Sequence, residues 1–93
     1  MKYYDWSLTK NEQLKTERQV LFEDVVLAIT SGDLLDTIGH PNKKKYPNQK
    51  IFIVKINDYV YLVPFIEDEN IIFLKTIIPS RKMTQKYLRK KSK

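Results

Sequence analysis

The middle of the chain holds three short runs rich in β-branched and aromatic residues, which suit the pleated surface of a sheet. The runs are residues 50–56, 59–66 and 71–78. Asn57-Asp58 leaves room for a two-residue hairpin turn and residues 67–70 for a four-residue turn, so the runs predict an antiparallel meander. Pro64 has no backbone N–H, which predicts a bulged or partly unpaired position in the middle strand.

The residues before the meander have the pattern of two helices. Ser7 can cap a first helix over residues 8–18. In the next segment apolar residues recur at i, i+3, i+4 and i+7, which predicts an amphipathic helix over 22–31, ended by Gly32. These two helices lead into the sheet.

A short strand over 34–38 and a terminal helix capped by Ser80 complete the order α, α, β, β, β, β, α. We therefore expect an α+β fold with two N-terminal helices, a four-stranded antiparallel sheet and a C-terminal helix, as one domain over residues 1–93. The helices are expected to cover one face of the sheet and leave the other for a ligand.

Composition excludes several classes of site. There are no cysteines and one histidine, so the chain has no disulfide, no thiolate metal site and no conventional zinc centre of two or three histidines. We expect neither a metal nor another cofactor. The first residues lack the apolar core of a signal peptide, and no apolar run reaches the roughly 18 residues of a membrane span. A cytoplasmic location without membrane contact is the expectation.

Charge is distributed unevenly along the chain. Residues 1–42 hold 4 basic and 7 acidic side chains, whereas residues 43–93 hold 13 basic and 4 acidic ones. Lys and Arg that neutralise phosphates release condensed counterions, so a basic second half suits a nucleic-acid partner. The alternative is that the lysines only keep a small domain soluble.

Several short motifs, in their order and spacing, resemble the BrnT family of toxins, which belong to bacterial toxin–antitoxin pairs. They are Tyr4-Asp5-Trp6, Lys10 four residues later, Phe22-Glu23-Asp24 and, after the last strand, Ser80-Arg81-Lys82. The resemblance implies a RelE-like fold, endoribonuclease activity that stops translation, and neutralisation by a small DNA-binding antitoxin. Where many such sequences carry Lys-His-Gly, this chain has Glu17-Arg18-Gln19. If that histidine contributes to catalysis in the family, Arg18 replaces it as a catalytic residue here or the mechanism differs.

RNA cleavage without a metal needs a base for the ribose 2′-OH, an acid for the leaving oxygen, and cations for the charge on phosphorus. RelE-like toxins use Lys, Arg and Tyr for this. Arg81, at the strand-to-helix junction, is the first candidate, because a guanidinium there can hold phosphate oxygens bidentately. Lys75 lies either at the rim of the sheet or in a cleft, with Lys55 as a possible neighbour, and Tyr87 is either core or acid.

His40 is a further catalytic candidate because its ordinary pKa lies near neutrality, although nothing in the sequence places it beside Arg81 or Lys75. Trp6 is expected to anchor the core rather than to stack on a base. Other basic residues are candidate RNA contacts that add affinity without sequence preference. They are Lys43, Lys44, Lys45, Lys50, Lys55, Lys82, Lys86 and Arg89.

The sequence therefore predicts a metal-independent endoribonuclease toxin whose partners are RNA and a cognate antitoxin. Two alternatives stay open. One is a non-catalytic module that binds nucleic acid or the ribosome, which the same basic and aromatic residues would serve. The other is an inactive protein that only pairs with a partner.

Overall fold

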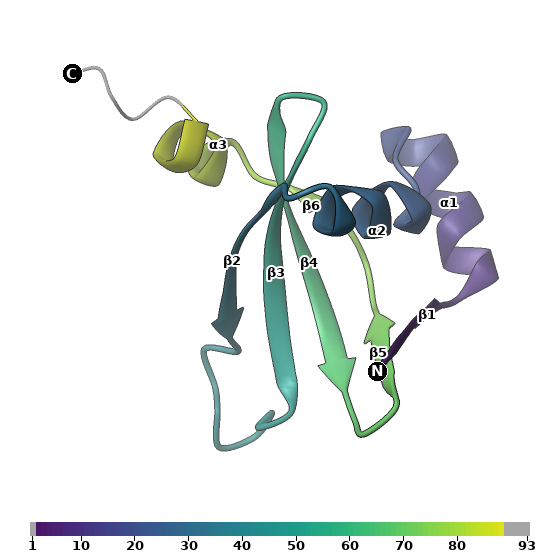
Figure 1. The fold of residues 1–93 in the computed structure, drawn as a ribbon, viewed down its shortest axis with the longest axis vertical. Helices are drawn as coiled ribbons and strands as arrows, with labels where there is room; N and C mark the ends of the chain where they lie inside the picture. Colours follow the sequence, from purple (N-terminus) through teal and green to yellow (C-terminus); the bar gives the residue numbers. More distant parts are fainter. Residues whose placement is uncertain (1, 89–93) are drawn as a thin grey trace.

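Three helices and a mixed sheet make up the fold, which the computed structural model describes for residues 2–88 (Figure 1). The elements in chain order are β1 (Tyr3–Trp6), α1 (Leu8–Arg18), α2 (Phe22–Thr30), β2 (Leu34–Gly39), β3 (Gln49–Ile56), β4 (Tyr59–Glu67), β5 (Ile71–Leu74), β6 (Ile78–Pro79) and α3 (Arg81–Leu88). The strands lie in the order β1-β5-β4-β3-β2, and β6 pairs with β4. The expectation of an α+β fold is confirmed at this level.

The turns and caps that the local sequence predicted are present in the structure. The Ser7 hydroxyl accepts a hydrogen bond from the Lys10 N–H at 3.2 Å, which caps α1. Gly32 ends α2 with a φ of +89°, a conformation that favours glycine. Asn57 and Asp58 both have positive φ, as the hairpin turn between β3 and β4 requires.

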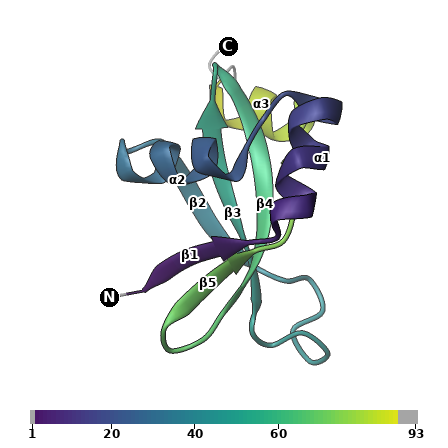
Figure 2. The same ribbon diagram turned by 90° about the vertical axis from the view of Figure 1, so that its right-hand side faces the viewer.

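The prediction of a four-stranded antiparallel sheet is wrong at its N-terminal edge. β1 adds a strand, and it pairs with β5 in parallel, Tyr3 opposite Ile71 and Trp6 opposite Leu74 (Figure 2). Trp6 is partly buried against the core and stacks on Phe22 with ring centroids 5.7 Å apart. Trp6 is thus the core anchor that was predicted, and it fixes β1 beneath the two helices.

The predicted strand over 71–78 is two short strands, and Pro64 explains the break. The Lys75 N–H donates to the Pro64 carbonyl at 2.8 Å, but proline has no N–H to complete the pair. β5 therefore pairs with β4 only beyond Pro64, and β6 pairs with it only before, opposite Tyr61 and Leu62. The prediction that the strand is partly unpaired at Pro64 is confirmed.

The main core lies between the sheet and helices α1 and α2, on what we term the core face. Its sheet residues alternate along the strands, and the rings of Phe52 and Phe65 stack at 3.9 Å. The buried members of this cluster are Leu14, Val20, Phe22, Val25, Ala28, Phe52, Val54, Ile56, Val63, Phe65, Leu74 and Ile77.

The opposite side of the sheet, the second face, is not left open along its whole length. Ile53 and Val60, which alternate with the core residues, are fully buried, and so is Thr84 of α3. The Thr84 hydroxyl accepts a hydrogen bond from the Val60 N–H at 2.9 Å. The expectation that all helices lie on one face is therefore wrong, because α3 covers part of the other face.

The helices of the described residues are short and polar in part. None of them is long and apolar enough to cross a membrane.

Candidate nucleic-acid interface

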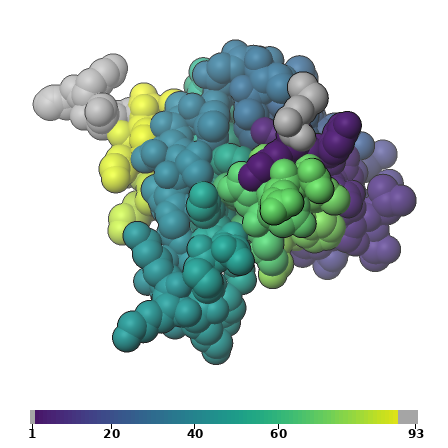
Figure 3. Space-filling view, turned by 60° about the horizontal axis from the view of Figure 1, so that its bottom comes forward, coloured from purple at the N-terminus to yellow at the C-terminus, as the bar shows by residue number. Residues whose placement is uncertain are grey.

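The connection between β2 and β3, residues 40–48, is the most basic part of the fold, and we term it the basic loop. Residues 37–57 contain five lysines and neither Asp nor Glu. Figure 3 shows this loop, in teal, standing out from the rest of the surface at the lower left. No acidic residue within this stretch of sequence neutralises the lysines of the loop.

Asn42 organises the basic loop. Its N–H donates to His40 Nδ1 at 2.9 Å, and its side-chain oxygen accepts from the Lys45 N–H at 3.1 Å. The Tyr46 N–H donates to the Asn42 carbonyl at 3.0 Å, and the His40 N–H closes the base of the loop on the Gln49 carbonyl at 3.1 Å. The loop is therefore held by its own backbone and is not an extended linker.

Aromatic and basic side chains meet on this framework. The His40 and Tyr46 rings contact each other with centroids 4.5 Å apart, and Lys45 Nζ lies 5.4 Å from the Tyr46 centroid. Lys43 crosses Gly39 so closely that a methyl group there would lie 3.1 Å from Lys43 Cε. A groove of about 440 Å³ opens beside these residues, with His40, Lys43 and Pro47 in its lining.

The predicted RNA-contacting lysines divide into paired and unpaired groups. Lys50 lies 3.4 Å from Glu67, and Lys55 lies 3.8 Å from Asp33. By contrast Lys43, Lys44 and Lys45 are exposed and form no ion pair with another residue of the described part of the chain. The uncompensated charge of this region therefore lies in the basic loop.

The predicted catalytic residues do not converge. Arg81 is exposed at the start of α3, and Lys75 is exposed between β5 and β6. Lys55 is opposite Val60, whereas Lys75 is beside Pro64, so the suggestion that the two lysines are neighbours is wrong.

Tyr87 and Arg18 have local partners instead of a shared site. The Tyr87 hydroxyl donates to Asp36 at 3.1 Å, and partial burial, followed by this carboxylate, raises the pKa of Tyr87. The Arg18 guanidinium donates to the carbonyl of Ile77, which ties the end of α1 to the residue before β6. Arg18 therefore has a structural contact at the position where the resembling family carries a histidine.

The remaining predicted contacts lie on α3 or beyond it. Lys82 and Lys86 are exposed on α3, and Lys86 Nζ is 5.6 Å from the Tyr87 ring centroid. Arg89 lies outside the described residues. Among residues 2–88 no group of His, Asp and Glu is arranged to hold a metal ion.

Tyr46 and Asn42 belong to this interface but were not predicted from the sequence. The turn-forming Pro41-Asn42 pair and the second proline of the loop were signals for an ordered turn. Nothing in the sequence indicated that Tyr46 would fold back onto His40, because this contact depends on the hydrogen bonds of Asn42.

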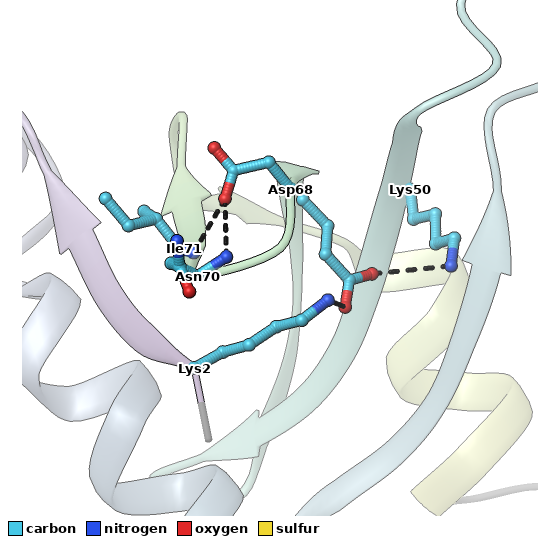
Figure 4. A network of polar contacts seen from close by, with 6 residues as sticks. Lys2, Lys50, Asp68, Asn70 and Ile71 are labelled. Atoms are coloured by element: carbon cyan, nitrogen blue, oxygen red, sulfur yellow. Dashed lines mark hydrogen bonds and ion pairs between the residues drawn. The ribbon is translucent and has the colours of Figure 1, made fainter.

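An acidic turn lies next to the basic loop at the end of β4 (Figure 4). Glu67 accepts hydrogen bonds from Lys2 and, more weakly, from Lys50, and these contacts lower the pKa of Glu67. Asp68 accepts from the N–H groups of Ile71 and Asn70, and these bonds lower the pKa of Asp68. The turn therefore keeps its negative charge at neutral pH.

The basic loop offers positive charge and hydrogen-bond donors to a phosphate group. Because His40 Nδ1 accepts the Asn42 N–H, the neutral ring carries its proton on Nε2. Nε2 is then a hydrogen-bond donor beside the lysines, and the Tyr46 ring offers an aromatic surface. The arrangement is that of a binding site for an anionic, partly aromatic ligand.

Comparisons with known proteins do not assign the chain: no family model, no curated protein and no solved structure matches it. The residues behind the resemblance to BrnT-type toxins have structural roles in the fold. Trp6 stacks on Phe22, and the Asn11 side chain bonds both Phe22 and Glu23.

Proposed function

We propose that the protein acts on RNA and that the basic loop holds a single-stranded segment through its phosphates. The observation that carries the proposal is that one ordered loop holds three exposed lysines, none in an ion pair within the described residues, together with the His40–Tyr46 pair. Single-stranded RNA offers both chemical groups that this cluster suits, since it has phosphates for the lysines and unstacked bases for the aromatic ring.

The proposal is tested by the salt dependence of binding to a fluorescent oligouridine, measured by anisotropy between about 50 and 200 mM salt. Each phosphate contact adds about 0.7 to the slope of log K against log salt concentration for single strands. A Lys44→Ala, Lys45→Ala double variant should therefore make this negative slope shallower by about 1.4. The matched control removes Lys10 and Lys15 of α1 and should leave the slope as it is. Equal behaviour of the two double variants would contradict the proposal.

The more specific hypothesis is that the protein is the endoribonuclease toxin of a toxin–antitoxin pair. It rests on the resemblance and on one further observation, the position of His40 among lysines. In such a cleavage the 2′-hydroxyl loses its proton to water, the 2′-oxygen bonds to phosphorus, the bond to the 5′-oxygen breaks, and the leaving 5′-oxygen takes a proton from water. We assign His40 Nε2–H as a hydrogen-bond donor to a phosphate oxygen, where it and the loop lysines stabilise the charge on phosphorus.

Cleavage is tested with purified protein and RNA, in the presence and in the absence of ribosomes. We expect the parent to release fragments that carry a cyclic phosphate, and a His40→Ala variant, which lacks the Nε2–H donor, to bind RNA but to release fragments much more slowly. The Arg81→Ala and Lys75→Ala variants test the other candidate residues by growth arrest on expression. Binding without fragments under both conditions would favour the alternative, a non-catalytic nucleic-acid- or ribosome-binding module.

An antitoxin is supported by an apolar band on the part of the second face that α3 does not cover. Alternation and register place exposed apolar residues of four strands on this face, with Lys75 beside them and Lys82 and Lys86 on α3. The band consists of Tyr3, Ile38, Ile66, Ile71 and Phe73. Apolar surface bordered by cations suits an acidic, amphipathic segment.

The antitoxin hypothesis is tested by co-expression with the product of the neighbouring open reading frame. We expect Phe73→Asp to abolish co-purification and rescue from growth arrest. Leu27→Asp is the matched control, because Leu27 is also an exposed apolar residue but lies on α2. Rescue that survives Phe73→Asp would exclude the band as the antitoxin site.

A further inference from the structure

Lys50 lies on the boundary between the basic loop and the acidic turn. It is part of the lining of the groove beside His40 and Lys43, and also of a second groove of about 620 Å³ that contains Glu67, Asp68 and Glu69. One lysine is therefore exposed to both surfaces. Which surface it serves depends on where its ammonium group is held.

In the structure the ammonium group is held by the acidic turn. Lys50 is opposite Phe65 in the sheet, so Glu67 is its diagonal neighbour on the same face. Lys50 Nζ lies 3.4 Å from Glu67 Oε1, while the other oxygen of Glu67 is in close contact with Lys2 (Figure 4). The Glu67 side chain is 28% exposed and that of Lys50 is 47% exposed, so water reaches this pair.

We propose that Glu67 limits the RNA-binding surface by holding Lys50, so that removal of this one carboxylate adds Lys50 to the phosphate contacts of the basic loop. The inference rests on the proposed RNA binding. An ion pair that water reaches stabilises a fold only weakly, so a phosphate group and Glu67 are close competitors for Lys50. Glu67 is then a residue that sets how far the RNA strand extends along the surface.

The second lysine bound to Glu67, Lys2, does not take part in the competition between Glu67 and a phosphate group for Lys50. Lys2 is held close by one carboxylate oxygen, whereas Lys50 is held loosely by the other. Lys2, the residue before β1, lines the acidic groove but not the groove beside His40. Loss of the Glu67 charge therefore releases Lys50 toward the basic loop.

The test is a double-mutant cycle on Glu67 and Lys50, read as the salt slope of binding to the fluorescent oligouridine. We expect Glu67→Gln to steepen the slope by about 0.7, the value of one phosphate contact on a single strand. Lys50→Gln should lower the slope more in the Glu67→Gln background than in the parent. A gain that persists in the double variant would overturn the inference, because it would come from net charge alone.

Two control variants distinguish the release of Lys50 from a general change in net charge and from a loosening of β1. Glu69→Gln removes the same charge from an exposed neighbour on the same turn and should change the slope by much less than Glu67→Gln. Lys2→Gln breaks the link between the start of the chain and Glu67 but leaves Lys50 paired, and should not steepen the slope. If Lys2→Gln reproduces the gain, loosening of β1 is the cause and the inference fails.

The inference and the proposed function fail in different ways. If removal of Lys44 and Lys45 leaves RNA binding intact, RNA binding by the basic loop is wrong. If that removal weakens binding while Glu67→Gln leaves the slope of the parent, the loop binds RNA and only the role of Glu67 is wrong.

Discussion

The hydroxyl of Thr84 in α3 accepts a hydrogen bond from the backbone N–H of Val60 in β4 at 2.9 Å, and neither residue is accessible to water. The same hydroxyl donates to the Ser80 carbonyl at 2.7 Å. A polar side chain of α3 thus supplies the acceptor for the Val60 N–H, and this contact fixes α3 on the second face of the sheet.

This contact predicts the effect of removing one hydroxyl. Thr84→Val keeps the shape of the side chain but leaves the Val60 N–H buried without a partner, which costs about 1–3 kcal/mol of unfolding free energy. Chemical denaturation measures the change. Thr16→Val is the control, because Thr16 is exposed on α1 and its substitution should change stability by less than about 0.5 kcal/mol. Equal effects of the two changes would show that the hydrogen bond does not stabilise the fold.

Asn11 makes a second buried polar contact, between α1 and α2. Its side-chain oxygen accepts from the Phe22 N–H at 2.8 Å and its amide donates to Glu23 at 2.9 Å. Asn11→Leu should lower the unfolding free energy by about 1–3 kcal/mol, because a buried N–H at the start of α2 loses its acceptor. An exposed asparagine, Asn48, provides the control, and denaturation curves of Asn11→Leu and Asn48→Leu that coincide would contradict this role.

The stacked phenylalanines predict how much the core contributes to stability. Phe65 is 2% exposed and stacks on Phe52, so Phe65→Ala should cost about 3–5 kcal/mol of unfolding free energy. Phe73 lies on the neighbouring strand but is 36% exposed, and Phe73→Ala should cost clearly less. Urea denaturation at neutral pH compares them. A loss of unfolding free energy at Phe73 as large as that at Phe65 would mean that the second face contributes as much to stability as the core face.

The lowered pKa of Glu67 predicts that the fold loses stability in acid. Its folded-state pKa is lowered, first by the hydrogen bond from Lys2, so the unfolded chain binds the proton more readily than the folded one. The stabilisation is complete above the unfolded pKa, near 4.5, and is lost as the pH falls through the folded value. Unfolding free energies measured from pH 6 downward should show this loss.

The Glu67→Gln variant isolates that contribution. It should lose less stability than the parent between about pH 5 and pH 3, while the contribution of Asp68, whose pKa is also lowered, remains in both proteins. The same acid dependence in variant and parent would show that Glu67 does not carry it.

Two corrections to the predicted sheet have separate physical causes. β1 was missed because four residues, half of them exposed, carry no periodic signal, and their partner strand lies near the other end of the sequence. The strand predicted over 71–78 is divided because Pro64, on another strand, cannot donate a hydrogen bond to it. The sequence of residues 71–78 carries no sign of this missing bond. Both errors concern pairing between distant segments.

The sequence predicted the positive charge of the candidate site but not the set of residues that are grouped in it. The lysine run 43–45 and His40 were recognisable as residue types, and the basic loop contains them. Their grouping with Tyr46 depends on the Asn42 turn, and the separation of Arg81, Lys75 and Arg18 from them depends on where the sheet places each element. Sequence patterns give no distance between segments that are joined only by tertiary packing.

The sequence by itself determined the helices, the hairpin turn at Asn57-Asp58, the caps at Ser7 and Ser80, and the excess of positive charge after residue 42. These depend on interactions within a few residues, namely backbone conformation, local hydrogen bonds and apolar periodicity. Only the tertiary structure decided that β1 pairs with β5, that α3 crosses to the second face, and which lysines keep their charge unpaired. Those features depend on contacts between distant segments, where packing and hydrogen bonding across the sheet select among partners that the local sequence leaves equivalent.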